Sequence, residues 1–129
     1  MKKLIAASLL LLLLAIPVLA NDIPAPFSKI KEIALRGPSI GGIHETKITI
    51  NEDGREIEYL FGYATPQNAY GVHESVGIAK AIGTEIEVYG YCLLHKEFYG
   101  AYGQQRFTEK EATEGAFKLF RELVSKNLL

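Results

Sequence analysis

The stretch KITINEDGREIEYLFGYA, residues 47–64, carries the strongest fold signal in this sequence. Ile48 and Ile50 alternate with polar residues, which is the pattern of a half-buried strand. The return segment, residues 55–64, places its apolar side chains on one face, at Ile57, Tyr59, Phe61 and Tyr63. Between the two lies Glu52-Asp53-Gly54, where glycine readily adopts the positive φ that a tight turn requires. The stretch therefore predicts an antiparallel β-hairpin.

Downstream of the hairpin, the pattern predicts a short helix and two further strands. Residues 74–83 form the helix candidate, with Ser75 as its cap and Gly83 as its stop. Residues 85–94 and 98–107 alternate as a strand pair. In the first of these, one face carries Ile86, Val88, Gly90, Cys92 and Leu94, and we expect this face to be buried. Cys92 would then be a buried, inert thiol.

The C-terminal segment is predicted to be a helix. Thr108-Glu109-Lys110-Glu111 matches a capping box, in which the first and last residues satisfy each other's backbone amides. An apolar stripe at helical spacing follows, at Ala112, Ala116, Phe117, Phe120, Leu123 and Val124. Gly115 disfavours a helix interior, which predicts close packing of the helix against the sheet at this point.

The order of elements indicates an α+β fold that is mainly β, in a single domain over residues 29–129. Residues 21–28 read as an extended lead-in, and residues 29–36 fit either a strand or a short helix. Over residues 29–107 the order resembles that of the OB-fold, which implies a five-stranded antiparallel barrel or curved sheet with the 74–83 helix as its plug. The alternative is an open antiparallel sheet with the last helix packed on it.

The first 20 residues have the features of a secretory signal. Met1-Lys2-Lys3 is followed by an apolar run that includes Leu9–Leu14, and a small-residue site ends at Ala20. We expect cleavage after Ala20, a periplasmic or secreted protein, and no stable membrane anchor afterwards. A retained leader, acting as an anchor, is the alternative.

The net charge and the cysteine content limit the classes of partner and the disulfides that are expected. Without the leader, the chain has 12 basic and 15 acidic residues, which gives a net charge of −3, and no basic patch is visible in the sequence. A nucleic-acid partner is therefore not expected. Cys92 is the single cysteine, so no intramolecular disulfide forms. We expect neither a cofactor nor a metal.

Three patterns resemble catalytic or metal-binding motifs, and each has a plainer structural interpretation. Residues 37–41, GPSIG, match G-x-S-x-G, but a strand is predicted after Ser39 instead of the helix that a nucleophile elbow requires. Cys92 and His95 have the spacing of a metal half-site, yet they point to opposite faces of a regular strand. The pairs Glu56/Glu58 and Glu85/Glu87 read as solvated outer faces of a sheet. No catalytic residue is predicted.

The aromatic content gives the best functional hint. Five side chains are predicted to form a ligand-binding face, namely Tyr89, Tyr91, Tyr99, Tyr102 and Arg106. Flat rings beside a guanidinium suit an oligosaccharide or a protein partner. The sequence thus favours a non-enzymatic binding domain. The alternatives are a small interaction protein that inhibits another secreted protein and, less favoured, a small hydrolase.

Overall fold

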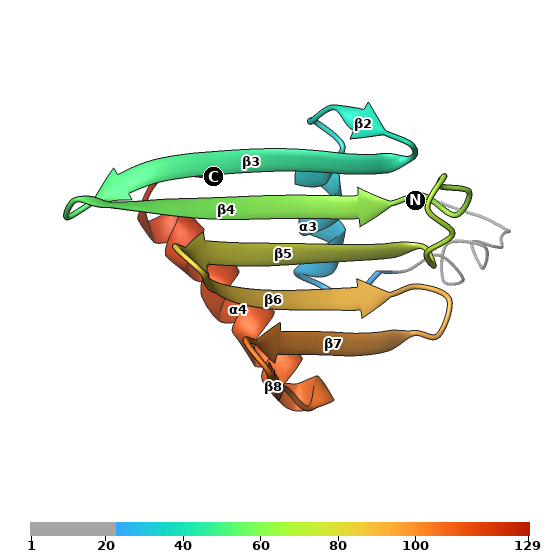
Figure 1. Ribbon diagram of the computed structural model, residues 1–129. Helices are drawn as coiled ribbons and strands as arrows, with labels where there is room; N and C mark the ends of the chain where they lie inside the picture. Colours follow the sequence, from blue (N-terminus) through green and yellow to red (C-terminus); the bar gives the residue numbers. More distant parts are fainter. Residues whose placement is uncertain (1–22) are drawn as a thin grey trace, which may run out of the picture.

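In the computed structural model, the chain folds into a seven-stranded antiparallel sheet that is covered on one face by two helices (Figure 1). The structure describes residues 23–129. The strands are neighbours in the order in which they follow one another along the chain. They are β2 (Ser39–Ile40), β3 (Ile43–Glu52), β4 (Arg55–Ala64), β5 (Ser75–Ile82), β6 (Glu85–Cys92), β7 (Glu97–Tyr102) and β8 (Gln105–Arg106). The helices are α3 (Phe27–Ala34) and α4 (Glu109–Ser125).

The predicted hairpin is confirmed as β3 and β4. The two strands pair along their whole length, and Glu52 lies opposite Arg55 across a two-residue turn. Asp53 and Gly54 both have positive φ, 54° and 78°. Turns of this kind match the right-handed twist of the flanking strands, which explains why an Asp-Gly pair fixes the register here.

The barrel prediction is wrong, and the open α+β sheet is the architecture observed. Each strand pairs only with its sequence neighbours, so β2 and β8 form the two edges and the sheet does not close. Residues 74–83, predicted as a helix, contain strand β5. Val76 and Ile78 on this strand point to the helices and are buried, so its apolar residues follow a two-residue period.

Helix α3 begins inside the segment predicted as an extended lead-in. It starts at Phe27, and its buried residues are Phe27, Ile30, Ile33 and Ala34. They pack on β3, β4 and β5. The choice between a strand and a short helix for residues 29–36 is therefore settled as helix through Ala34, with a turn after it.

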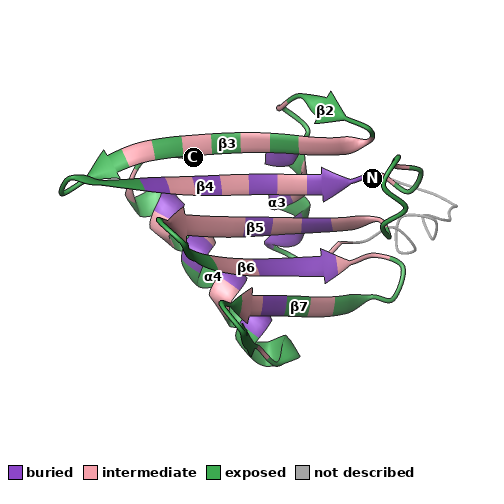
Figure 2. Ribbon diagram, viewed as in Figure 1, coloured by how far each residue is buried: buried purple, intermediate pink, exposed green. Residues whose placement is uncertain are grey.

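The hydrophobic core lies between the sheet and the two helices (Figure 2). On the sheet side it contains large residues of β4, β5 and β6, with Tyr59 and Phe61 fully buried. On the helix side α4 contributes Ala112, Ala116, Leu119 and Leu123. We call this side of the sheet the covered face and the other side the uncovered face.

Strand β6 turns the opposite face to the core from the one predicted. Tyr89 and Tyr91 are the core residues, at 7% and 6% exposure. Ile86, Val88, Gly90 and Cys92 alternate with them and belong to the uncovered face. Cys92 is only half-buried, which corrects the expectation of a core thiol. The two-residue period was predicted correctly, but the wrong face was assigned to the core.

The C-terminal helix is confirmed together with its cap. The Thr108 hydroxyl accepts from the Glu111 amide at 3.2 Å, and the Glu111 carboxylate accepts from the Thr108 amide at 2.9 Å. The expected close approach at Gly115 is also present, because a Cβ there would collide with the Tyr89 ring. Residues 1–20, with the predicted signal, lie outside the described residues. Within residues 23–129, no helix is long and apolar enough to cross a membrane.

Candidate functional site: the uncovered face of the sheet

Three glycines lie side by side across the middle of the uncovered face. The register places Gly62 of β4 opposite Gly77 of β5, and Gly77 opposite Gly90 of β6. The same row begins at Glu45 on β3 and ends at Tyr99 on β7. Glycine weakens a strand interior and often marks a place where another group approaches closely. A row of glycines on three neighbouring strands therefore requires an explanation.

The Tyr99 ring explains one of the three glycines. It lies on Gly90, where any side chain would collide with it, and its hydroxyl reaches to 3.6 Å from a Cβ built at Gly77. Burial raises the pKa of the Tyr99 hydroxyl more than a hydrogen bond with Ser75 lowers it. At Gly62, by contrast, a Cβ would have no heavy atom within 4 Å among its described neighbours. The row is therefore filled at the β7 end and open at the β4 end.

An apolar groove of about 380 Å³ runs over this open end. Its walls include Ile43, Leu60, Val72, Val88 and the Tyr99 ring, and Gly62 and Gly77 line its floor. A second hollow of about 400 Å³ shares Ile43 and Val72 with it and extends the apolar surface to Ile40 and Tyr70. Ile40, Tyr70 and Val72 are exposed at 72%, 62% and 48%. Together the two hollows form a continuous apolar surface that the helices leave uncovered.

Two carboxylates stand beside the groove without an ion-pair partner among residues 23–129. Glu45 occupies the β3 end of the glycine row, and Glu97 lies next to the row on β7. Neither forms a salt bridge with a described residue, whereas Lys47 pairs with Glu58 at 3.5 Å. The groove is thus apolar at its floor and acidic at its ends.

The five residues predicted to form one ligand-binding face occupy different places. Tyr89 and Tyr91 are buried beneath the helices, where Tyr89 stacks on Phe107 and Tyr91 packs against Phe27. Tyr102 shares the orientation of Tyr89 but is exposed at the end of β7, 3.4 Å from Glu85. Tyr99 and Arg106 do share the uncovered face. The prediction of a single aromatic face is wrong because β6 turns its tyrosines inward.

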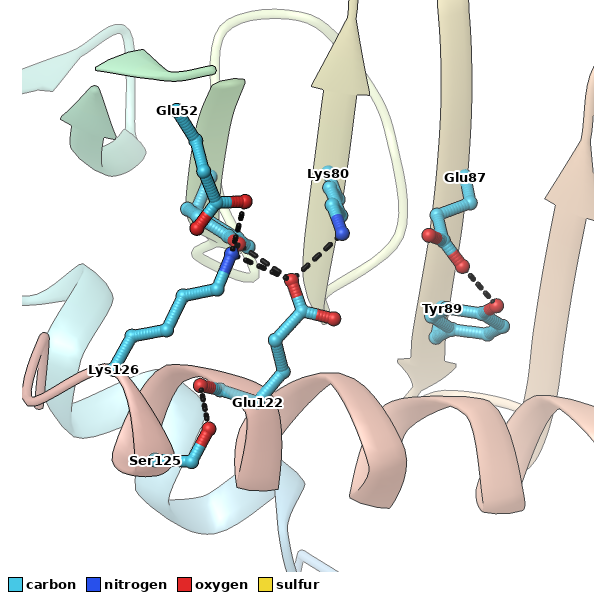
Figure 3. A network of polar contacts seen from close by, with 8 residues as sticks. Glu52, Lys80, Glu87, Tyr89, Glu122, Ser125 and Lys126 are labelled. Atoms are coloured by element: carbon cyan, nitrogen blue, oxygen red, sulfur yellow. Dashed lines mark hydrogen bonds and ion pairs between the residues drawn. The ribbon is translucent and has the colours of Figure 1, made fainter. Parts of the chain in front are cut away.

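A polar network joins the C-terminal end of α4 to the covered face (Figure 3). The Glu122 carboxylate accepts from the Tyr59 hydroxyl and from Lys80 Nζ at 2.7 Å. Lys126 Nζ donates to the Tyr59 hydroxyl oxygen at 3.0 Å and pairs with Glu52 at 3.2 Å. Beside it, the Tyr89 hydroxyl donates to Glu87. Each of these tyrosines is therefore buried at its ring and satisfied at its hydroxyl.

The pKa shifts of Glu122, Tyr59 and Lys126 keep these three groups in their ordinary charge states. Burial alone would raise the pKa of Glu122, but hydrogen bonds from Lys80 and Tyr59 outweigh it and lower the pKa below 4.5. Burial and the Glu122 carboxylate raise the pKa of Tyr59, and the Tyr59 hydroxyl raises that of Lys126. Catalytic acids and bases are usually tuned toward neutral pH instead. The arrangement accordingly suits attachment of α4 to the sheet.

The motif-like patterns have structural explanations. Within GPSIG, Ser39 lies in strand β2. A Cβ at Gly37 would collide with the Glu45 carbonyl, so Gly37 allows a close approach of the two backbone segments. Cys92 Sγ lies 4.0 Å from His73 Nδ1, and the His73 and His95 rings are 4.9 Å apart. No set of three His, Cys, Asp or Glu within residues 23–129 has the arrangement of a metal site.

The glutamate pairs divide between the faces. Glu56 and Glu58 lie on the uncovered face, as expected. Glu87 does not lie on an outer face, because it belongs to the covered side and accepts a hydrogen bond from Tyr89.

Sequence reasoning missed the residues that build the groove. Leu60, Gly62 and Gly77 were not singled out, since their proximity depends on the register of β4 with β5. One signal was present. Gly83-Thr84, read as a two-residue hairpin turn instead of a helix end, places Gly77 opposite Gly90.

No protein-family model, no curated protein and no solved structure matches this chain.

Proposed function

We propose that this protein is a non-enzymatic binding domain that holds a protein partner in the groove of its uncovered face. The observation that carries the proposal is the unfilled part of the glycine row. A Cβ at Gly62 would meet no atom within 4 Å, yet the position is bare and apolar walls surround it. An exposed apolar surface of this kind is typical of interaction sites.

A protein fits the groove better than an oligosaccharide. Leu60, Val88 and Ile43 offer apolar contact and few hydrogen-bonding groups, whereas sugars require many polar partners. The carboxylates of Glu45 and Glu97 at its ends favour a partner segment in which basic residues flank an apolar side chain. A periplasmic or secreted location belongs to the same proposal, and inhibition of another secreted protein is its alternative.

The experiment uses Cys92 as an attachment point. Cys92 is half-buried, lies opposite Ser75 on the wall of the groove, and is the single cysteine of the chain. A photo-crosslinker attached there should trap the partner in the compartment where the protein resides. Gly62→Val fills the groove and should abolish the crosslink. Ala81→Val adds similar bulk to the same face outside the groove and should leave the crosslink intact.

Two results would contradict the proposal. If Gly62→Val and Ala81→Val trap the partner equally well, the groove is not the binding site. If an oligosaccharide panel binds the wild-type protein and Gly62→Val abolishes that binding, the site is correct but the partner class is wrong.

A further inference from the structure

A pocket of about 610 Å³ lies at the end of the sheet where β4 ends and β5 begins (Figure 1). Three parts of the chain line it, namely Ile23 with Lys31 of α3, the connection between β4 and β5, and the β6–β7 loop. It is distinct from the groove of the uncovered face, because none of its lining residues comes from the floor of that groove at Gly62 and Gly77. A hollow of this size can hold a small molecule.

Hydrogen bonds hold the walls of this pocket in place. The Asn68 side chain donates to the Thr65 and Val72 carbonyls at 2.8 Å and accepts from the Val72 amide at 3.2 Å. The Leu93 amide donates to the Glu74 carbonyl at 2.9 Å, which joins the connection between β4 and β5 to the start of the β6–β7 loop. The pocket is therefore preorganised, and preorganisation lowers the cost of binding.

Two lysine side chains line the pocket without a carboxylate partner in the described part of the chain. Neither Lys31 nor Lys96 forms a salt bridge there. Glu32, which follows Lys31 in the sequence, pairs with Lys29 at 3.4 Å instead. Lys31 Nζ lies 4.6 Å from the centre of the Tyr63 ring, a contact that positions the ammonium group but supplies no oxygen acceptor.

One carboxylate, that of Glu74, also lines the pocket. It accepts from the Tyr63 hydroxyl at 2.6 Å, which fixes its position. With histidine counted as neutral, two lysines against one glutamate give the lining a net charge of +1, whereas the whole chain has a net charge of −1. This local excess of positive charge favours a ligand that carries a single negative charge.

The remaining lining determines the rest of the ligand. Much of it is apolar and comes from Ile23, Val72, Tyr91, Leu93 and Leu94. A phosphate group fits this lining less well than a carboxylate, since it carries nearly two negative charges at neutral pH. None of the described lining residues is an arginine, and the amides of Val72 and Leu93 are already bonded to Asn68 and Glu74.

We propose that this pocket binds a small organic carboxylate with an apolar body. Lys31 and Lys96 provide the positive charge for the carboxylate, and Glu74 repels it, which orients the ligand in the pocket. The apolar body contacts Tyr91 and Leu93. The site is separate from the groove that holds the protein partner, so either one can exist without the other.

Octanoate is the probe that tests the proposal, and octanol is its uncharged counterpart of equal chain length. Each is titrated into folded protein from cells that produce the full chain, and binding is followed by NMR. Octanoate should cause saturable shifts at Leu93 and Lys96 at low-millimolar concentration, as expected for a ligand of this size. It should bind at least about fivefold more tightly than octanol, because only octanoate carries the charge.

Four substitutions test the charges of the pocket. Lys31→Met and Lys96→Met each remove a charge but keep a long apolar stem, and each should weaken octanoate binding about threefold to tenfold. Glu74→Gln retains a hydrogen-bond acceptor and removes the repulsion, so it should strengthen the binding. Lys110→Met is the matched control, because Lys110 is exposed at the start of α4 and does not line the pocket. It should leave the affinity unchanged.

Several results would overturn the proposal. The first is a wild-type protein that shows no saturable octanoate binding, and the second is an equal loss of affinity in Lys96→Met and Lys110→Met. Weaker binding by Glu74→Gln would mean that the pocket selects a cation. Loss of octanoate binding in Gly62→Val would place the probe in the groove instead. Lys96 is exposed and Glu74 lies outside the core, so these two variants decide the question even if Lys31→Met does not fold.

Discussion

The two faces of the sheet use opposite kinds of residue at neighbouring positions. On the covered face, β4 presents Tyr59, Phe61 and Tyr63, whose rings are buried under the helices. On the uncovered face, the same strand presents Leu60 and Gly62, and the glycine row continues onto β5 and β6. Large rings on one side fill the space below the helices, whereas missing side chains on the other leave space unoccupied. The comparison indicates that one face stabilises the fold and the other is available for binding.

The largest difference between the faces should appear on truncating neighbouring residues of β4. Phe61 is fully buried, so Phe61→Ala should lower the free energy of unfolding by about 3–5 kcal/mol. Leu60 is half-buried on the uncovered face, and Leu60→Ala should cost less than about half as much. Urea denaturation of both variants measures the difference. Equal losses would mean that both faces are packed against something.

The close contact between α4 and β6 should make Gly115 intolerant of a methyl group. Alanine favours a helix over glycine by about 1 kcal/mol, but a Cβ here would collide with the Tyr89 ring. Gly115→Ala should therefore destabilise the protein by about 1–3 kcal/mol, as overpacked cores do. Tyr89→Leu should rescue the variant in a double-mutant cycle. A stabilising Gly115→Ala would contradict the packing of α4 on Tyr89.

The polar network at Glu122 should make the stability of the protein depend on pH in the acidic range. The pKa of Glu122 is lower in the folded state, so its contribution is complete above about pH 4.5 and is lost as pH falls through the folded pKa. Glu122→Gln should cost about 1 kcal/mol near neutral pH, since Glu122 remains partly exposed. Thermal melts between about pH 6 and pH 3 should show this cost shrinking. A cost that stays constant over this range would exclude the charged network.

The uncovered face should respond to an added methyl group with the opposite sign. Gly62 has no positive φ and no atom within 4 Å of a Cβ, so Gly62→Ala should raise the free energy of unfolding by about 0.4–1 kcal/mol. The substitution restricts the unfolded chain and costs nothing in the folded one. Differential scanning calorimetry beside Gly115→Ala provides the comparison. A loss of stability at Gly62 would indicate that the space is already filled.

Local signals in the sequence predicted local structure well. The Asp53-Gly54 turn fixed the β3–β4 hairpin, and the Thr108–Glu111 cap fixed the start of α4, because both depend on residues a few positions apart.

Which face of β6 is buried depends on the helices. Ile86 and Val88 are more apolar than Tyr89 and Tyr91, yet the tyrosines fill the larger space under α4 and α3, and Tyr89 satisfies its hydroxyl on Glu87.

The groove could be predicted only in part. The turn at Gly83-Thr84 relates Gly77 to Gly90 within one hairpin. Gly62 and Gly77 are instead connected through the irregular segment 65–74, whose length does not set a register. The pairing that completes the glycine row is therefore a product of the folded sheet.

The central claim is that the space at Gly62 is kept for a partner, and one variant tests it most directly. In Gly62→Val, the yield of the Cys92 photo-crosslink is measured on a preparation whose unfolding free energy has been determined. We predict a protein at least as stable as the wild type that no longer crosslinks its partner. A stable Gly62→Val protein that crosslinks the partner with unchanged yield would contradict the claim.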